Sequence, residues 1–307
     1  MPEPESLVLA LYDACNTADV AAIRALLADD FTHYSLGPSA QSAPIRSAAQ
    51  LATQAAAAAT EQQARWRVDR IITEATDVGV EYTMWLSDPS GSPQVRRGSE
   101  WIELTPQATG IAQIRSYHHV GQPSDLDGFD YASVDAATRP AITSGARVER
   151  LDAIASYYDA CTAADVNALM AFFTNDVVHY FLQPNVGSRP VAGREHLARY
   201  WRKVSQRINA RWVVDSIIAR GDEAVIEWSM FWNPDAGTDR IVTRGMEWYA
   251  FEDALIGQIR SYHVQLREST ELEEFDYLAA GYSMLEAERS ALHIPHPEDL
   301  IGNRRRA

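Results

Sequence analysis

Two halves of this chain carry the same ordered sequence. Residues 12–20 (YDACNTADV) return 146 positions later as residues 158–166 (YDACTAADV). Residues 113–118 (QIRSYH) return unchanged at 258–263, a shift of 145 positions. Because the shift stays nearly constant, the chain contains one domain duplicated in tandem. Each copy then spans about 150 residues, a usual size for a domain with its own core.

The charge balance of the chain argues against two classes of partner. Its 27 basic and 42 acidic residues leave a net charge of −15, which disfavours both nucleic acid and anionic membrane surfaces. No apolar run is long enough to span a bilayer, and the acidic start at residues 1–5 is not a signal peptide. We therefore expect a cytoplasmic protein. The single lysine, Lys203, indicates a GC-rich bacterial genome.

Hydrophobic periodicity orders each copy as three helices followed by strands. Helical spacing covers the opening of each copy, then 20–28 and 48–63 in the first and 166–173 and 194–209 in the second. Short β segments are expected at 31–35 and 177–182. A period of two predicts longer strands over 65–74, 78–86, 95–104, 111–120, 211–220, 224–232, 241–251 and 255–264. This order predicts an α+β domain in each copy, with helices on one face of a curved antiparallel sheet.

The repeat also sets the expected domain limits. They are a first domain over 1–125, a linker over 126–148 and a second domain over 149–277. A C-terminal helix over about 278–292 and a tail make up the last segment, 278–307.

An ordered set of short motifs carries a family resemblance. In the second copy these are residues 175–179 (NDVVH), 191–195 (VAGRE), 244–248 (RGMEW) and 258–262 (QIRSY). The chain resembles the nuclear transport factor 2-like superfamily, in its SnoaL-like polyketide cyclase and ketosteroid isomerase branch. The resemblance implies two cone-shaped, cystatin-like domains, each with three helices packed on a strongly curved antiparallel sheet around a pocket. It also implies an intrachain pseudo-dimer, and a further homo-oligomer stays open.

Glu247 and its counterpart Glu100 are the first candidates for a functional site. The resemblance places Glu247 where ketosteroid isomerases carry an acid in their oxyanion hole. Such a buried carboxyl stays protonated and donates a hydrogen bond to a developing enolate. The alternative is an ion pair of Glu247 with Arg244 or Arg260.

Tyr157 is the second candidate, because the resemblance places it at the oxyanion tyrosine. The first copy has Leu11 there, so a donor pair of Tyr157 and Glu247 would exist in the second copy alone. The alternative is that Tyr157 is an aromatic core residue. The catalytic aspartate of the isomerases falls near Phe181, or Ser35 in the first copy, and neither residue can abstract a proton.

Four histidines could supply the missing base. His33 and His179 occupy the first short β segment of each copy, and His118 and His263 end the last strand. Histidine titrates near neutral pH and acts as a general acid or base. Packing residues are the alternative interpretation. Metal binding is less favoured, because no tight ligand spacing is present.

The third helix separates the two copies further. Residues 194–201 (REHLARYW) carry bulky side chains that could roof a pocket, whereas residues 55–59 are five alanines. We therefore expect the second domain to be the active one and the first to be its structural partner. The residues expected to contact substrate are Tyr180, Phe181, Trp201, Tyr249 and Arg244.

The favoured hypothesis is a cofactor-independent enzyme that moves a proton on a hydrophobic small molecule, as in isomerisation, cyclisation or dehydration. No cofactor is expected, because the sequence has no Walker loop, dinucleotide fingerprint or CxxC motif. One alternative is epoxide opening, as in an epoxide hydrolase or an ether-forming cyclase. It requires a carboxylate pair or an arginine–carboxylate pair, for which Arg244 and Glu247 are the candidates. The other alternative is a non-catalytic ligand-binding or assembly module.

Overall fold

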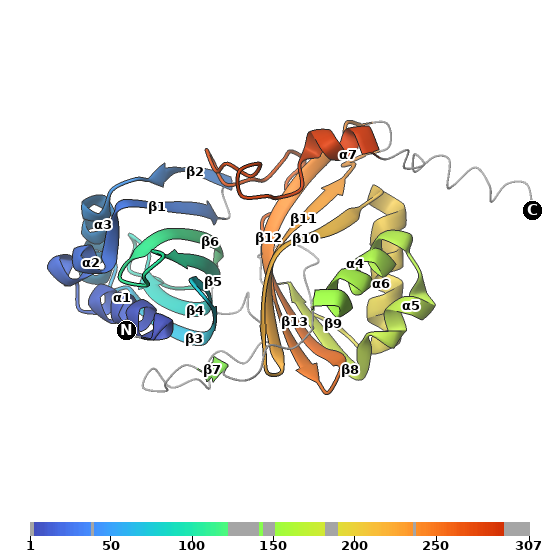
Figure 1. The fold of residues 1–307 in the computed structure, drawn as a ribbon, viewed down its shortest axis with the longest axis horizontal. Helices are drawn as coiled ribbons and strands as arrows, with labels where there is room; N and C mark the ends of the chain where they lie inside the picture. The colour runs from blue at the N-terminus through green and yellow to red at the C-terminus, as the bar shows by residue number, and fades with distance from the viewer. Residues whose placement is uncertain are drawn as a thin grey trace, which may run out of the picture. The chain divides into compact units, whose positions relative to one another are not determined.

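The structure is a computed structural model, and it describes residues 3–37, 40–121, 141–143, 151–181, 190–235 and 238–291. Within these residues the chain forms two units, and each has its own sheet and its own helices (Figure 1). The first domain runs from helix α1 to strand β7, and the second runs from helix α4 to helix α7.

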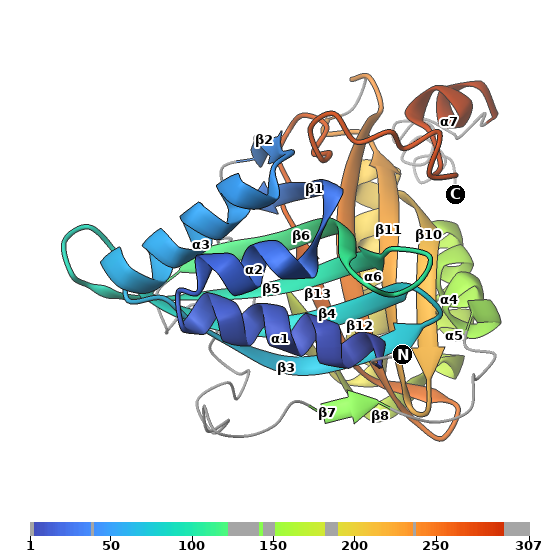
Figure 2. The same cartoon turned by 60° about the vertical axis from the view of Figure 1, so that its left-hand side comes forward.

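Three helices cover one face of the first sheet. They are α1 (Pro4–Asn16), α2 (Val20–Leu26) and α3 (Ala48–Glu61), and Figure 2 shows them lying across the strands. Polar side chains fix where two of them begin. The Asp19 carboxylate accepts the Ala22 N–H at the start of α2, and the Ser47 hydroxyl accepts the Gln50 N–H at the start of α3.

The first sheet has seven strands in the order β2-β1-β6-β5-β4-β3-β7. Their bounds are β1 Leu27–Gly37, β2 Ala40–Ile45, β3 Arg65–Glu74, β4 Asp77–Ser87, β5 Pro93–Leu104, β6 Ile111–Gly121 and β7 Ala141–Thr143. The long strands β3 to β6 are antiparallel to one another, whereas β1 runs parallel to β6 and β7 runs parallel to β3. The centre of the sheet, β5 with β6 and β4, therefore lies below the helices.

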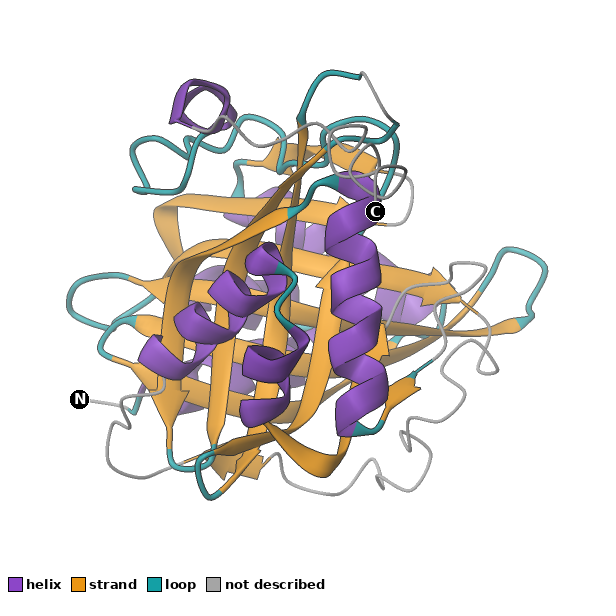
Figure 3. Ribbon diagram, turned by 90° about the vertical axis from the view of Figure 1, so that its right-hand side faces the viewer, coloured by secondary structure: helices purple, strands orange, loops and turns teal. Residues whose placement is uncertain are grey.

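The second domain repeats this plan with a six-stranded sheet in the order β10-β11-β12-β13-β8-β9. Its strands are β8 Phe173–Phe181, β9 Val191–Ala192, β10 Arg211–Arg220, β11 Glu223–Trp232, β12 Ile241–Glu252 and β13 Leu255–His263. Its helices are α4 Leu151–Ala163, α5 Val166–Ala171, α6 Arg194–Ile208 and α7 Leu285–Ala291. Figure 3 shows helices of this domain on one face of its strands.

Matching irregularities bend both sheets at the same place. The pairing of β3 with β4 shifts between Val68 and Arg70, and the pairing of β10 with β11 shifts between Val214 and Ser216. An extra residue in one strand increases the local bend and twist. Each sheet thus curves toward its helices, which produces the expected cone-shaped interior of an α+β domain.

The structure confirms the predicted fold class and the long strands, two of which, β3 and β10, match their predicted limits. The C-terminal helix is shorter than expected, because turns occupy residues 278–281 and α7 begins at Leu285. Strand β7 lies within the predicted linker and pairs with β3. Strands of two to six residues, such as β2, β7 and β9, have too short a pattern to be predicted. The domain limits and the pseudo-dimer stay predictions. No helix in the described residues is long and apolar enough to cross a bilayer.

Candidate functional site

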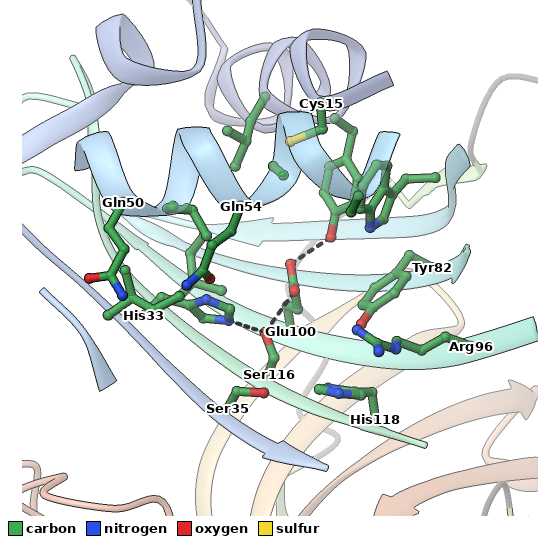
Figure 4. A pocket seen from close by; sticks show the side chains of 18 of the residues that line it. Cys15, His33, Ser35, Gln50, Gln54, Tyr82, Arg96, Glu100, Ser116 and His118 are labelled. Carbon is green, nitrogen blue, oxygen red and sulfur yellow. Dashed lines mark hydrogen bonds between the residues drawn. The ribbon is translucent and has the colours of Figure 1, made fainter. Parts of the chain in front are cut away.

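A chain of hydrogen bonds centred on Glu100 crosses the interior of the first domain. The Tyr12 hydroxyl donates to Glu100 Oε2 at 2.5 Å, and the Ser116 hydroxyl donates to Glu100 Oε1 at 2.7 Å. His33 Nε2 lies 2.8 Å from the same Ser116 oxygen. Figure 4 shows Glu100, Ser116 and His33 converging from strands β5, β6 and β1.

The strand register explains why these residues meet. Glu100 on β5 stands directly opposite Ser116 on β6, and His33 on β1 is paired with Ile114, two residues before Ser116. Because side chains alternate along a strand, Glu100, Ser116 and His33 share the face that the helices cover. Tyr12 reaches them from the buried side of α1.

These polar residues border a cavity of about 430 Å³. His118, Ser35, Gln50, Gln54, Tyr82 and Arg96 add further polar groups to its lining. Apolar walls come from α3 and the sheet, through Leu51, Ala55, Ala58, Trp66 and Ile114. An apolar cavity of this size with a few convergent polar groups is typical of a small-molecule site.

Burial shifts the pKa values of the two central groups in opposite directions. Loss of hydration raises the pKa of the Glu100 carboxyl, although the hydrogen bonds from Tyr12 and Ser116 and the charge of Arg96 act against the rise. Burial, with a contribution from Arg96, lowers the pKa of His33 to about 4. His33 is therefore neutral at pH 7. Its Nδ1 is buried and, among the described residues, has no hydrogen-bond partner.

The second domain repeats the frame of this site around Glu247. Tyr158 and Tyr249 both donate to Glu247 Oε2, at 2.7 and 2.5 Å. Ser261 donates to Glu247 Oε1 at 2.7 Å. The Ser261 oxygen lies 3.2 Å from His263 Nδ1, and burial lowers the pKa of His263 to about 4.

Aromatic rings surround His179, the second-domain counterpart of His33. Phe181 stacks on it with ring centroids 4.1 Å apart, and Trp201 lies 5.3 Å away. His179 is fully buried, and its Nε2 is 3.8 Å from the nearer Glu247 oxygen. Within the described chain, neither of its ring nitrogens has a hydrogen-bond partner.

Side-chain volume separates the two interiors. Repeat position and strand register pair Phe181 with Ser35, because Phe181 faces Ser261 as Ser35 faces Ser116. Trp201 on α6 corresponds to Ala55 on α3 by the repeat shift. Tyr249 corresponds in the same way to Ile102. Phe181 and Trp201 thus occupy positions whose counterparts, Ser35 and Ala55, line the cavity of the first domain.

Tyr157, which is predicted to form a donor pair with Glu247, does not hydrogen-bond to Glu247. Its ring packs against Tyr158, Phe173 and Tyr249, at centroid distances of 5.4, 5.5 and 6.3 Å. The hydroxyl that reaches Glu247 belongs to Tyr158, which the first copy shares as Tyr12. The donor is therefore common to both domains, and the contrast between Tyr157 and Leu11 does not distinguish them.

Two predicted contact residues lie away from the Glu247 site. Arg244 is three positions before Glu247 on β12, so its side chain is on the opposite face. It bonds Glu271 at 2.8 Å and Ser229 at 2.5 Å rather than Glu247. Tyr180 lies between His179 and Phe181 on β8, and alternation turns it to the other face as well.

The sequence missed three residues of the first site. Ser116 stands in the repeated QIRSYH motif and Tyr12 in the repeated YDAC motif, so their retention in both copies was an available signal. Arg96 gave no such signal, because its second-domain counterpart is Thr243. Among the described residues, no three histidine, cysteine, aspartate or glutamate side chains are grouped so that they could hold a metal ion.

Three solved structures are among those to which parts of this chain are similar. A protein of unknown function with a cystatin-like fold from Methylobium petroleophilum PM1 is 31% identical over 46% of this chain and 95% of its own, with a TM-score of 0.34. A ketosteroid isomerase-like protein from Catenulispora acidiphila DSM 44928, in complex with trimethylamine, is 17% identical over 37% and 85%, with a TM-score of 0.33. Rv0760c from Mycobacterium tuberculosis, in complex with estradiol-17beta-hemisuccinate, is 13% identical over 38% and 94%, with a TM-score of 0.34.

None of the curated proteins matches the chain. The model of the SnoaL-like domain matches it twice, over residues 8–117 and 154–259, and these two segments make up more than half of its length. The first matched segment contains Tyr12, Glu100 and Ser116, and the second contains Tyr158, Glu247 and Tyr249 but ends before Ser261. The chain therefore belongs to the SnoaL-like domain family, with one copy of the domain in each half.

Proposed function

We propose that the first domain is a cofactor-independent enzyme site, in which His33 and Glu100 move a proton on a largely apolar small molecule. One observation carries the proposal. The hydrogen-bonded chain from His33 through Ser116 to Glu100 lies in the lining of the 430 Å³ cavity. A base must be within hydrogen-bond reach of its substrate, and a cavity beside it supplies that place.

The direction of the hydrogen bonds supports a proton relay. Ser116 donates to the Glu100 carboxylate, so its oxygen can accept the Nε2–H of neutral His33. In this tautomer Nδ1 carries the lone pair that accepts a substrate C–H proton, once the side chains that bury Nδ1 move aside. The Nε2 proton then moves to Ser116, and the Ser116 proton moves to Glu100. The electron pair of the C–H bond stays on the substrate as an enolate.

The opposite pKa shifts fit this relay. His33 is neutral before and after the transfer, which suits a group whose pKa burial lowers to about 4. The proton ends on Glu100, whose pKa burial raises. Tyr12 donates to Glu100 in both states and holds it in place. Reversal of the relay returns the proton to the same or another carbon in isomerisation, to the new alkoxide oxygen in cyclisation, or to the leaving hydroxyl oxygen in dehydration. The three reactions share the deprotonation step.

This proposal reverses the expectation that the second domain is the active one. Glu247, His179 and His263 keep the same residue types, but Phe181 and Trp201 pack directly against His179. A substrate carbon would have to take the place of these rings to reach the imidazole. The second domain is accordingly proposed as a structural partner.

Proton exchange into an enolisable ketone tests the proposal. We expect the protein to accelerate deuterium uptake at the α-carbons of 2-tetralone in D₂O, measured by NMR. His33→Gln and Glu100→Gln should each lower this rate by roughly 10²–10⁴-fold. Ser116→Ala breaks the relay and should lower the rate while leaving ligand affinity unchanged. The matched control is Glu247→Gln, which should retain the wild-type rate. Loss of exchange in Glu247→Gln with retention in Glu100→Gln would assign the chemistry to the second domain.

Epoxide opening is a second candidate, favoured by one observation. Arg96 and Glu100 line the same cavity, four residues apart on one face of β5. An ionised Glu100 could direct water at an epoxide carbon, and Arg96 could stabilise the oxygen that leaves it. Hydrolysis of styrene oxide in H₂¹⁸O separates the two candidates, because an epoxide-opening enzyme produces the labelled diol and a proton-transfer enzyme leaves the epoxide intact.

A further inference from the structure

Arg96 brings a positive charge into the cavity of the first domain. Residues 96, 98 and 100 alternate to the same face of β5, so Arg96 points to the side that carries Glu100. Arg96 is part of the cavity lining, and Figure 4 shows its guanidinium beside the rings of Tyr82 and His118. It is half-buried.

The guanidinium of Arg96 lacks the acceptors that buried arginines usually have. Among the described residues, Arg96 forms no hydrogen bond and no ion pair, and its Nε is buried without a partner. Arg97, the next residue, faces the other side of the sheet and pairs with Glu81 and Asp69. The charge of Arg96 acts on the Glu100 carboxyl, but no hydrogen bond joins the two side chains. The guanidinium of Arg96 therefore keeps its N–H donors for a group from outside the fold.

The second domain shows that the fold does not require an arginine at this place. The counterpart of Arg96 is Thr243. Thr243 lies two residues before Gly245 on β12, as Arg96 lies two residues before Gly98 on β5. The Thr243 hydroxyl accepts the indole N–H of Trp232 at 2.9 Å. In the second domain this position is thus satisfied by a hydrogen bond within the fold, whereas in the first domain a cation lines the cavity.

We infer that the ligand of the first domain is an apolar molecule with a single carboxylate, which Arg96 binds. The inference rests on the proposed function only for the location of the ligand. A guanidinium presents two parallel N–H groups that match the two oxygens of a carboxylate. The apolar wall from α3, Trp66 and Ile114 receives the rest of the molecule. Glu100 lines the same cavity and would repel a second anionic group.

Paired ligands that differ in charge alone test this inference. The probes are 2-naphthoate against 2-naphthamide and decanoate against decanamide, with dissociation constants measured by isothermal titration calorimetry. We expect Arg96→Thr, which copies the second domain, to weaken binding of the carboxylates by at least about tenfold. Binding of the amides should stay within about twofold, because their apolar contacts are unchanged. Arg24→Thr is the matched control, since it removes the same charge from an exposed residue outside this cavity.

Each outcome decides for or against the anionic ligand. Equal weakening of carboxylates and amides would mean that Arg96→Thr deforms the cavity, and that result would overturn the inference. So would unchanged carboxylate binding in Arg96→Thr, or failure of both carboxylates to bind the wild-type protein at millimolar concentration. A carboxylate that binds through Arg96 while the protein fails to exchange protons in 2-tetralone would support the inference and contradict the proposed function.

Discussion

A missing side chain sets the position of Tyr82 at the cavity. Gly98 on β5 stands opposite Tyr82 on β4, and a Cβ atom added at Gly98 would overlap the Tyr82 ring. The second domain repeats the device, because a Cβ on Gly245 would lie 2.7 Å from the Trp228 ring. In each domain an aromatic ring folds over a glycine of the next strand.

Gly98→Ala should therefore damage the cavity. The methyl group would push the Tyr82 ring from its place, and overpacking of this kind costs about 1–3 kcal/mol of unfolding free energy. We expect a lower midpoint of urea unfolding and weaker ligand binding together. Gly110→Ala is the control, because its new Cβ would meet its nearest neighbour, the Ala28 nitrogen, at an ordinary 3.6 Å. Similar losses in both variants would show that backbone effects, and not the Tyr82 ring, cause the change.

Sequence comparison of the two copies could identify individual functional residues only where both copies share them. The structure places three of these candidates, His33, His118 and Glu100, in the lining of one cavity. The comparison of the copies missed Arg96, which is present in one copy. Tyr157 is predicted because the family resemblance places it at the oxyanion tyrosine, and the sequence does not show that its neighbour Tyr158 contacts Glu247. A contact of this kind depends on the orientation of α4 over β12, and that is a tertiary property.

The side chains of helix α3 and of its counterpart α6 determine how much of the space between helix and sheet is occupied in each domain. The sequence shows alanines on the first and bulky residues on the second, and bulky residues were expected to roof a pocket. In the structure Trp201 on α6 is buried against His179 and Trp212, with ring centroids 5.3 Å from each. A sequence gives the volume of a side chain, but whether that volume lines a space or fills it depends on the distance between helix and sheet.

Transfer of one ring from α6 to α3 should close the first cavity. Ala55→Trp places an indole where the second domain has Trp201, and it should abolish binding of the ligand by occupying its space. The midpoint of urea unfolding should fall only slightly, because the ring enters an existing cavity. Thr53→Trp puts the same ring on the exposed side of α3 and should leave binding intact. Retained binding in Ala55→Trp, measured by calorimetry, would place the ligand elsewhere.

At the scale of the whole molecule, the buried histidines make stability sensitive to acid. Burial lowers the pKa of His33 and of His263 to about 4, and it lowers the pKa of His179 as well. A histidine with a lowered pKa contributes full stability above pH 6.5, and that contribution is lost as the pH falls toward 4. Glu100 and Glu247 act in the opposite sense, since burial raises their pKa values.

The free energy of unfolding should therefore carry a histidine contribution that decreases between pH 6.5 and 4. Replacement of His263 by Gln removes one such group, so the variant should lose less stability over this interval than the wild-type protein. A pKa shift from 6.5 to about 4 corresponds to roughly 3 kcal/mol. Urea unfolding at half-unit steps of pH measures the slope. His196→Gln is the control, because that side chain is exposed. Parallel slopes in His263→Gln and the wild-type protein would contradict the assignment.

The hydrogen-bonded tyrosine, glutamate and serine are also present in the second domain, where aromatic rings pack on its histidine. This arrangement has a consequence for redesign. Phe181 and Trp201 are the rings that pack on His179, while Tyr158, Glu247 and Ser261 are already held in place by hydrogen bonds. Truncation of two aromatic side chains would open a chamber beside a preorganised polar group, without new backbone. If the first cavity binds a ligand as proposed, such a variant would offer two cavities in one chain, one native and one engineered.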